Sequence, residues 1–326
     1  MLISIIIPCY NEEESLLQLF TEIDSVLDIE SLDAEVLLID DGSVDRTAQI
    51  IEEKASEPNS IYRSITFKRN HGQTAAMLAG MDYSCGEVIV PLDADLQNPP
   101  SEIPKLLAKL DEGYDVVSGW RRDRKDKMIS RKIPSVIANW LIGRISGVPL
   151  HDYGCSLKAY RRDVIKGVRL YGEMHRFIPV YASWQGAKVT EVPVLHRARE
   201  FGDSKYGINR TFKVILDLLT VKFLGDYGQK PIYFFGFLGM FLCLLGGLAG
   251  VETLIEKWLI GTKVHTNPFI FLAIFLSIVG VQSIMMGLLA DLQMRTFYES
   301  QGKRTYLIRN MVGFDKNTRT SATTGN

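Results

Sequence analysis

Two long stretches without a charged residue, 231–251 and 266–290, constrain the fold of this chain more than any other feature. A helix rises about 1.5 Å per residue, so roughly 20 apolar residues cross the ~30 Å hydrocarbon core of a bilayer. The alternative is a pair of buried helices in a soluble core, but such helices normally keep a polar face. We therefore expect one transmembrane helix over each stretch.

The charges that flank the two stretches predict their orientation. Basic residues precede the first stretch and follow the second: Arg210, Lys213, Lys222, Lys230, Arg295, Lys303, Arg304 and Arg309. In the connector, residues 252–265, two lysines are offset by two glutamates. Because cytoplasmic loops carry the excess of Lys and Arg, we expect an external connector and cytoplasmic termini. The protein would then be a multi-pass protein of the cytoplasmic (inner) membrane. Its self-association through these helices stays open.

The overall composition argues against several classes of protein. The net charge is -1, so no basic field would attract nucleic acid. No CxxC spacing is present, which argues against a zinc site or a disulfide framework and suits a reducing compartment. The cysteines are Cys9, Cys85, Cys155 and Cys243. The N-terminal apolar run is short and ends at Pro8, unlike a signal peptide.

The first half of the chain alternates between strand and helix patterns. Strand-like segments lie at 2–8, 35–40, 64–69, 87–93 and 115–120. Helical segments lie between them, at 13–27, 47–55, 74–84 and 103–113. This alternation predicts a Rossmann-like α/β domain with a mostly parallel sheet covered on both faces. We expect the domain to occupy residues 1–206 and to bind its ligands outside the carboxyl ends of the strands.

Two further segments have a basic, amphipathic pattern. One is 132–145, and the other, 208–224, lies in a juxtamembrane region at 207–230. Such helices can lie in the membrane interface, and we expect this of the juxtamembrane helix. For 132–145, packing on the domain's own core is an equal alternative. We expect the remaining residues, 291–326, to form a cytoplasmic tail.

Two aspartates one residue apart follow the fourth strand-like segment. Asp93 and Asp95 would point the same way in an extended chain, and two carboxylates suit Mg²⁺ or Mn²⁺. A metal there would neutralise the charge that grows on a nucleoside diphosphate leaving group. The alternative is a pair of solvated loop carboxylates, because this pattern is common by chance. Its place directly after a buried strand favours the metal site.

A second acidic group follows the second strand-like segment. Asp40 or Asp41 could accept a hydrogen bond from a base or ribose, and Gly42 permits a turn. An alternative is that Asp40 or Ser43 caps the helix that begins near Arg46, while the other aspartate binds a nucleotide. No GxGxxG follows the first strand, which disfavours a Rossmann dehydrogenase.

Four motifs in order resemble the A-type-fold glycosyltransferases of family 2. They are IIIPCYNEEESL, LLIDDGSVDRT, NHGQTAAMLAG and DADLQNPP. The chain most resembles the dolichyl-phosphate mannosyltransferase-like branch of that family. Within the branch it resembles the bacterial polyprenyl-phosphate glucosyltransferases that end in two transmembrane helices. The resemblance covers roughly residues 1–305.

The resemblance implies inverting transfer from a nucleotide-sugar. The residues that it implies around the nucleotide are Pro8, Tyr10, Glu12 and Asp41. At the divalent metal it implies Asp93, Asp95 and Gln97. It also implies an aspartate near the sugar and the acceptor, Asp152, which we expect to be catalytic together with Asp93 and Asp95. A phosphate nucleophile is largely ionised at neutral pH, so the role of Asp152, as a base or a positioning residue, stays open. We expect the neighbouring His151 to be structural.

Basic residues predict where anionic groups bind. Seven of them lie between positions 121 and 132 and could contact anionic lipid headgroups. The resemblance implies a sharper role for two, Arg121 and Arg131, at the phosphate of the lipid acceptor, where the arginine fork suits oxyanions. A later loop resembles the family's RxxGxSKY pattern. There, Arg199 and Lys205 would neutralise the leaving diphosphate, with membrane-surface charge as the alternative.

We therefore expect metal-dependent, inverting transfer of a hexose, glucose from UDP-glucose, onto polyprenyl phosphate at the cytoplasmic membrane face. Relatives with similar motifs use GDP-mannose, UDP-N-acetylglucosamine or modified pentoses, so the donor stays open. A processive polysaccharide synthase is disfavoured because no QxxRW segment is present and two spans are too few for a polymer channel. A catalytically silent membrane scaffold is disfavoured by the intact aspartates and arginines.

Overall fold

The computed structural model describes residues 1–122, 133–165, 174–198, 231–261, 263–299 and 306–314. The chain divides into two compact units. One comprises residues 1–221 with 303–326, and the other residues 222–302. The predicted juxtamembrane helix at 207–230 lies outside the described residues.

A mixed sheet of eight strands forms the centre of the first unit, in the order β7-β5-β6-β4-β1-β2-β3-β8. Its strands are β1 Ile3–Cys9, β2 Ala34–Asp40, β3 Tyr62–Phe67, β4 Val88–Pro91, β5 Val116–Trp120, β6 Lys158–Arg161, β7 Val189–Pro193 and β8 Ile308–Val312. β1 is parallel to β2 and β4, β2 to β3, and β5 to β7. β6 and β8 are antiparallel to their neighbours. All strands except β6 and β8 therefore run in one direction, as predicted.

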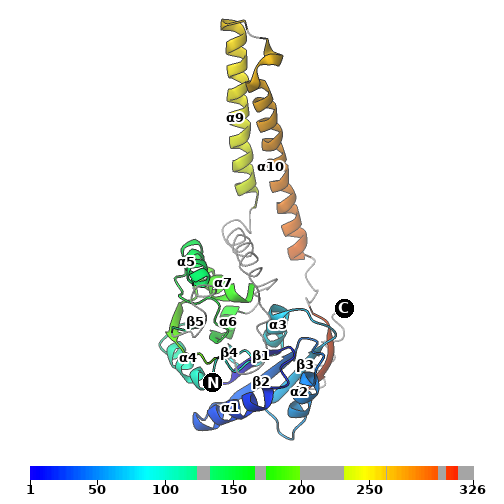
Figure 1. Cartoon of the computed structure of the whole chain (residues 1–326), viewed down its shortest axis with the longest axis vertical. Coiled ribbons are helices and arrows are strands. Elements are labelled where there is room, and N and C mark those ends of the chain that lie inside the picture. Colours follow the sequence, from blue (N-terminus) through cyan, green and yellow to red (C-terminus); the bar gives the residue numbers. More distant parts are fainter. Residues whose placement is uncertain (123–132, 166–173, 199–230, 262, 300–305, 315–326) are drawn as a thin grey trace. The chain divides into compact units, whose positions relative to one another are not determined.

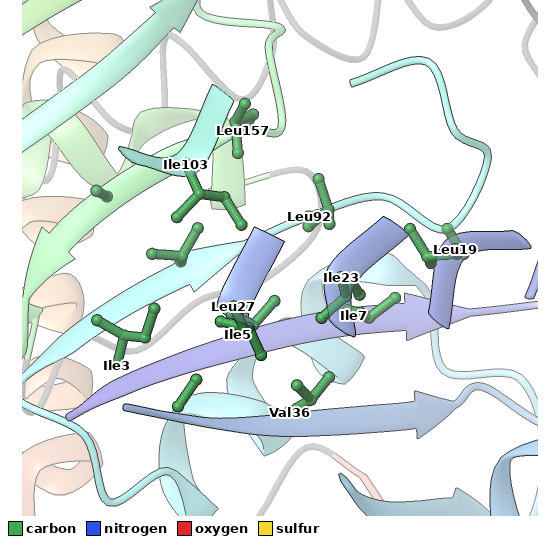
Figure 2. Close-up of a cluster of buried hydrophobic side chains, with 14 of the residues drawn as sticks. Ile3, Ile5, Ile7, Leu19, Ile23, Leu27, Val36, Leu92, Ile103 and Leu157 are labelled. Carbon is green, nitrogen blue, oxygen red and sulfur yellow. The ribbon is translucent and has the colours of Figure 1, made fainter. Parts of the chain in front are cut away.

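Helices cover both faces of this sheet (Figure 1). They are α1 Leu16–Ile29, α2 Thr47–Ala55, α3 Gln73–Tyr83, α4 Ile103–Asp111, α5 Ile133–Ser146, α6 Arg162–Ile165 and α7 Ile178–Trp184, with 3₁₀ turns η1 Pro100–Glu102 and η3 Met174–Phe177. Figure 2 shows Ile5 and Ile7 of β1 in a buried cluster with Ile23 of α1. On the opposite face, Ile6 contacts Gly80 of α3. Burial on both sides explains why β1 is apolar except for Ser4, whose hydroxyl donates to Glu35 at 2.6 Å.

The carboxyl ends of β1, β2, β4 and β5 lie at one edge of the sheet because these strands run the same way. Their last residues are Cys9, Asp40, Pro91 and Trp120. β6 runs in the opposite direction, so its first residue, Lys158, lies at the same edge. Residues 151–157 therefore join the loops that follow the parallel strands. This edge is where the sequence places the ligands.

The edge strand β8 is not predicted by the sequence and lies within the expected tail, residues 291–326. It pairs antiparallel with β3 and so belongs to the sheet of the first unit. Just before it, the buried ring of Tyr306 stacks on Phe67 with 5.2 Å between ring centroids. The Tyr306 hydroxyl donates to Asp82 at 2.7 Å. Part of the expected tail is therefore packed into the sheet of the first unit.

The second unit contains two long helices, α9 Pro231–Leu259 and α10 Pro268–Glu299, with the 3₁₀ turn η4 Val264–Thr266 between them. Both helices continue past the uncharged stretches that predict them. Their segments Phe234–Leu259 and Pro268–Ala290 have mean hydropathies of 2.1 and 2.4 and are long enough to cross a membrane. Only 17% and 11% of their most apolar windows are buried, which disfavours core helices of a soluble protein.

Small residues allow α9 and α10 to pack closely. A Cβ atom at Gly239 would lie 2.5 Å from the carbonyl oxygen of Gly280, so both positions need the space that glycine leaves. Large side chains such as Phe237 and Phe271 are exposed instead. Small residues between helices and large apolar residues outside are typical of helix pairs in lipid. These two helices associate the protein with a membrane.

Candidate active site

The loop after β1 is hydrogen-bonded to the loop after β2. The backbone N–H of Asn11 donates to Ser43 Oγ at 2.9 Å, and that of Val44 donates to Asn11 Oδ1 at 2.9 Å. The N–H of Glu12 donates to Thr47 Oγ1 at 2.8 Å. Three residues predicted to surround a nucleotide lie in or next to this paired region and are half-buried: Pro8, Tyr10 and Glu12.

The two aspartates after β2 have different partners. Asp40 accepts a hydrogen bond from the backbone N–H of Ser43 at 3.1 Å and so closes the turn of its own loop. Asp41 accepts from the N–H groups of His71 and Gly72, at 2.6 and 2.9 Å. Asp41 thus joins the β2 loop to the segment that precedes α3.

The turn at Gly42 brings the loops after β2 and β3 together. Gly42 has a φ of +72°, and a Cβ atom there would lie 2.5 Å from the carbonyl carbon of Arg69. The position therefore requires glycine, and the turn that Gly42 is expected to permit is present. The alternative that Asp40 or Ser43 caps α2 is wrong, since Asp45 accepts from the N–H of Thr47 at 3.0 Å and Asp40 closes its own turn.

Burial changes the acidity of Asp41. Asp41 is only 3% exposed, and desolvation raises the pKa of its carboxyl group to about 6. The hydrogen bonds from His71 and Gly72 oppose this shift, whereas the nearby charge of Asp40 adds to it. A carboxyl group with a raised pKa at the carboxyl end of a strand is typical of a ligand site.

The loop after β4 contains three partly accessible polar residues. Asp93, Asp95 and Gln97 are half-buried, whereas Ala94 and Leu96 between them are buried. The loop makes a turn at Ala94 and Asp95 instead of the extended chain that the sequence predicts. The alternation of accessible and buried residues is nevertheless kept, so the two carboxylates and the amide are all partly accessible.

The donor set of this loop fits a divalent cation. Carboxylate and amide oxygens are the ligands that Mg²⁺ and Mn²⁺ prefer. Across the described residues, no group of three or more His, Cys, Asp or Glu side chains could hold a metal. Asp93, Asp95 and Gln97 would therefore supply only part of a coordination shell, which leaves positions for phosphate oxygens and water.

An ion pair lies directly after β5. Arg121 Nε donates to Asp152 Oδ2 at 2.7 Å, and Nη2 donates to Oδ1 at 3.0 Å. The two side chains are 12% and 4% exposed. Burial lowers the pKa of Arg121, but the charge of Asp152 more than offsets this and leaves the pKa above its ordinary value. The charge of Asp93 also raises the pKa of Arg121, so the ion pair lies close enough to the loop after β4 to interact with it electrostatically.

The comparison with protein families decides the class. Residues 4–169, which include every site residue described so far, match the family described as Glycosyl transferase family 2. This chain belongs to glycosyltransferase family 2. The resemblance of its four motifs is confirmed, and the chain is an enzyme of the glycosyltransferase class.

Relatives of this glycosyltransferase match over nearly its whole length. The dodecaprenyl-phosphate galacturonate synthase of Rhizobium johnstonii is 42% identical over 310 residues, which cover 94% of this chain and 92% of the relative. The undecaprenyl-phosphate 4-deoxy-4-formamido-L-arabinose transferase of Klebsiella pneumoniae is 37% identical over 311 residues, covering 95% and 93%. The likeness therefore extends well beyond the catalytic domain.

Solved structures confirm the A-type glycosyltransferase fold. Glucosyl-3-phosphoglycerate synthase from Mycobacterium tuberculosis, in complex with Mn²⁺, UDP and phosphoglyceric acid, has a TM-score of 0.54 at 18% identity, covering 68% of this chain and 78% of that one. Mannosyl-3-phosphoglycerate synthase from Rubrobacter xylanophilus has a TM-score of 0.54 at 15% identity, covering 68% and 74%.

Polar and aromatic contacts surround the ion pair of this glycosyltransferase. The ring of His151 stacks on Trp120 with 4.4 Å between centroids, and its backbone N–H donates to Glu191 at 2.8 Å. These contacts agree with the structural role predicted for His151. The buried Lys158 donates to the carbonyl oxygen of Tyr153 at 3.3 Å, and desolvation lowers the pKa of its ammonium group to about 8. Lys158 therefore holds the chain just after Asp152.

The remaining predicted site residues lie outside the described part of the chain. They are Arg131, Arg199 and Lys205. Two residues that contact the site have no role that the sequence predicts: Gln73, whose Nε2 donates to Asp93 Oδ1 at 2.7 Å, and Lys158. Gln73 belongs to the NHGQ motif at residues 70–73. This motif contributes to the family resemblance, but the sequence does not show which residues its side chains contact. Lys158 begins an antiparallel strand that the strand pattern does not predict.

Proposed function

We propose that this glycosyltransferase transfers a sugar from a nucleotide-sugar to the phosphate of a polyprenyl phosphate at the cytoplasmic membrane face. The proposal rests mainly on one observation: an acidic loop and a buried arginine lie at the same edge of the sheet. Asp93, Asp95 and Gln97 fit a cation with a diphosphate, and Arg121 supplies a buried guanidinium nearby. The names of both relatives contain a polyprenyl phosphate, and both relatives match more than nine-tenths of this chain.

The nucleotide side consists of the loops after β1 and β2. We assign Pro8, Tyr10, Glu12 and the two aspartates to it because these loops form one hydrogen-bonded unit. A divalent cation, when bound to Asp93, Asp95 and Gln97, would neutralise charge on the leaving diphosphate. The Mn²⁺ and UDP in the Mycobacterium tuberculosis enzyme of the same fold support this assignment. Mg²⁺ and Mn²⁺ both fit the ligand set.

The acceptor side consists of Arg121 and its surroundings. A guanidinium has five N–H donors, and Asp152 receives two of them. Other donors of Arg121 would bind the lipid phosphate, with Arg131 as a second predicted ligand. One phosphate oxygen then attacks the anomeric carbon from the face opposite the diphosphate. The bond between that carbon and the diphosphate oxygen breaks, and the diphosphate leaves with the electron pair, so the configuration inverts.

This step needs no strong base. The acceptor phosphate is largely ionised at neutral pH, so its nucleophilic oxygen carries no proton that must be removed. Both oxygens of Asp152 accept hydrogen bonds from Arg121. We therefore assign Asp152 the role of orienting Arg121. Catalysis rests on positioning and on preorganised charge.

Strand β8 supports the proposed membrane topology. Because β8 pairs with β3 in the sheet of the first unit, we propose that the chain before α9 and the chain after α10 lie on the same side of a membrane. Two crossings, with the 252–265 connector outside, satisfy this requirement. The basic flanks then favour the cytoplasm for the catalytic domain and both termini. Arg199 and Lys205 are proposed to close over the diphosphate from the cytoplasmic side.

The sugar is the least constrained part of the proposal. Glucose from UDP-glucose is the expectation from the motifs, whereas the two relatives are named for galacturonate and a formamido-arabinose. A donor screen decides among them. The purified protein is incubated with short-chain polyprenyl phosphate, Mn²⁺ and UDP-glucose, UDP-galacturonate, GDP-mannose or UDP-linked 4-deoxy-4-formamido-L-arabinose. The lipid product is identified by mass spectrometry, and absence of any lipid-linked sugar would contradict transfer from each of these four donors.

A further inference from the structure

Four consecutive residues, His71 to Thr74, connect separate parts of the site. The backbone N–H groups of His71 and Gly72 donate to Asp41, the predicted nucleotide carboxylate. Gln73 Nε2 donates to Asp93 Oδ1 at 2.7 Å. These contacts place one short segment between the residues assigned to the nucleotide and those assigned to the metal.

The same segment is anchored to the fold on two sides. Gly72, with a φ of +94°, precedes the first residue of α3, and the hydroxyl of Thr74 lies 2.7 Å from His175 Nδ1 on η3. Phe67, at the end of β3, packs its ring edge-to-face with His71 at 5.6 Å. Contacts on both sides of Gln73 therefore restrict where its side chain can reach.

The bond from Gln73 selects one orientation of the Asp93 carboxylate. The amide nitrogen of Gln73 can only donate a hydrogen bond. It donates to Asp93 Oδ1, so Asp93 Oδ2 is oriented away from the amide. The amide is also neutral and therefore neither competes with a cation nor repels one. Partners of this kind orient ligand carboxylates, and their loss typically weakens metal binding tenfold to a hundredfold.

We propose that Gln73 is a positioning residue that holds Asp93 ready for the divalent cation. Through His71 and Gly72, it also sets the spacing between Asp93 and Asp41. This inference rests on the proposed function, because it takes Asp93 as a metal ligand. It predicts that nucleotide and metal bind cooperatively through residues 71–74.

A purely structural role for Gln73 is the alternative, and the chain offers a matched control. Gln49 Nε2 donates to Glu53 at 2.8 Å on the exposed surface of α2, so it makes the same type of bond away from the site. The test compares Gln73→Ala and Gln73→Met with Gln49→Ala and Gln49→Met. Methionine keeps most of the side-chain volume but removes the donor, which separates packing from hydrogen bonding.

The readout is the affinity for UDP, measured by calorimetry on the detergent-solubilised full chain with and without MnCl₂. In the wild type, Mn²⁺ should tighten UDP binding. In both Gln73 variants the affinity without metal should stay within about twofold, whereas the Mn²⁺ concentration needed for half of the tightening should rise about tenfold or more. Raising MnCl₂ should restore kcat, which a general folding defect would not allow. The Gln49 variants should match the wild type.

Two results would contradict this inference in distinguishable ways. If Mn²⁺ tightens UDP binding equally in the wild type and in both Gln73 variants, Gln73 does not position a metal ligand, while the proposed function stands. If Mn²⁺ has no effect on UDP binding to the wild type, the metal part of the proposed function fails, and the inference fails with it.

Discussion

Arg121 and Asp152 form a two-bond ion pair in which both side chains are almost fully buried. The two residues belong to different loops: Arg121 follows β5, and Asp152 lies in the segment before β6. The pair therefore fastens two loops of the active-site edge together. Since each partner neutralises the other in a desolvated place, removing either one leaves an unpaired buried charge.

The ion pair predicts a combined loss of acceptor affinity and stability. Arg121→Ala should lower kcat/KM for polyprenyl phosphate roughly ten- to a hundredfold, because a charge-assisted phosphate contact contributes about 1.5–3 kcal/mol. It should also lower the free energy of unfolding by about 3–5 kcal/mol, because Asp152 stays buried without its partner. Steady-state kinetics and denaturant unfolding measure the two effects.

Arg122→Ala is the matched control for this prediction, since Arg122 is the neighbouring arginine and is exposed. It should change both quantities little, and its effect should fade as salt rises. UDP affinity of folded Arg121→Ala should stay close to that of the wild type. Equal, salt-sensitive losses in the two variants would show that the basic segment only contacts the membrane.

Removing either aspartate of the β4 loop should abolish transfer without unfolding the protein. Asp93→Ala and Asp95→Ala delete half-buried carboxylates at the surface of the loop, so the core around Ala94 and Leu96 stays packed. We expect a loss of at least about a thousandfold in kcat, with a Tm within a few degrees of the wild type. EDTA should also stop the wild type, and added Mn²⁺ should restore it. Full activity in EDTA would exclude a metal role for this loop.

The raised pKa of Asp41 predicts opposite pH dependences for binding and stability. If the ionised carboxylate binds the nucleotide, UDP-sugar affinity should fall as pH drops through about 6. The folded state binds this proton more tightly than the unfolded chain, whose Asp pKa is about 3.9. The free energy of unfolding should therefore decrease as pH rises from about 4 to about 6.

The variant Asp41→Asn tests both statements. It cannot ionise, so its UDP-sugar affinity should be low at every pH, and the part of the stability slope between pH 4 and 6 due to Asp41 should disappear. Calorimetry with a UDP-sugar and denaturant unfolding at several pH values provide the two curves. An unchanged affinity profile would exclude Asp41 as the titrating nucleotide ligand.

Strand β8 predicts that the C-terminal segment stabilises the catalytic domain. Truncation after residue 300 keeps α9 and α10 but removes Tyr306 and β8, which leaves Phe67 and the edge of β3 uncovered. We expect a loss of about 3–5 kcal/mol, the usual cost of deleting a buried aromatic side chain, and a greater tendency to aggregate through the open edge. Truncation after Phe314 removes only residues 315–326 and should be neutral.

The proposed topology predicts which cysteines a membrane-impermeant maleimide labels in whole cells. In a Cys85→Ser background, Lys263→Cys in the connector should be labelled from outside, whereas Ser321→Cys should be labelled only after permeabilisation. In that topology the connector joins the outer ends of two spans, while β8 belongs to the sheet of the catalytic domain. Labelling of Ser321→Cys in intact cells would overturn this orientation.

The sequence by itself predicts the features that depend on local composition and order. The uncharged runs at 231–251 and 266–290 predict the apolar helices, because chain length and polarity decide whether a helix can cross lipid. The alternation of apolar strands with amphipathic helices predicts a mostly parallel sheet, because only burial on both faces allows a run such as Ile3 to Ile7. Parallel strands end at one edge, so the positions of Asp41 and Asp93 follow as well.

Only the tertiary structure decided which side chains meet. Arg121 pairs with Asp152, Gln73 with Asp93, and Tyr306 with Phe67, across 31, 20 and more than 200 residues of sequence. No local periodicity encodes such pairs, because each depends on how loops from separate strands approach after folding. From the sequence, Asp152 could be a base or a positioning residue, and its burial against Arg121 favours the positioning role. A motif can identify the residues of a site, but hydrogen-bond geometry and burial, which are properties of the packed chain, decide what each residue can do.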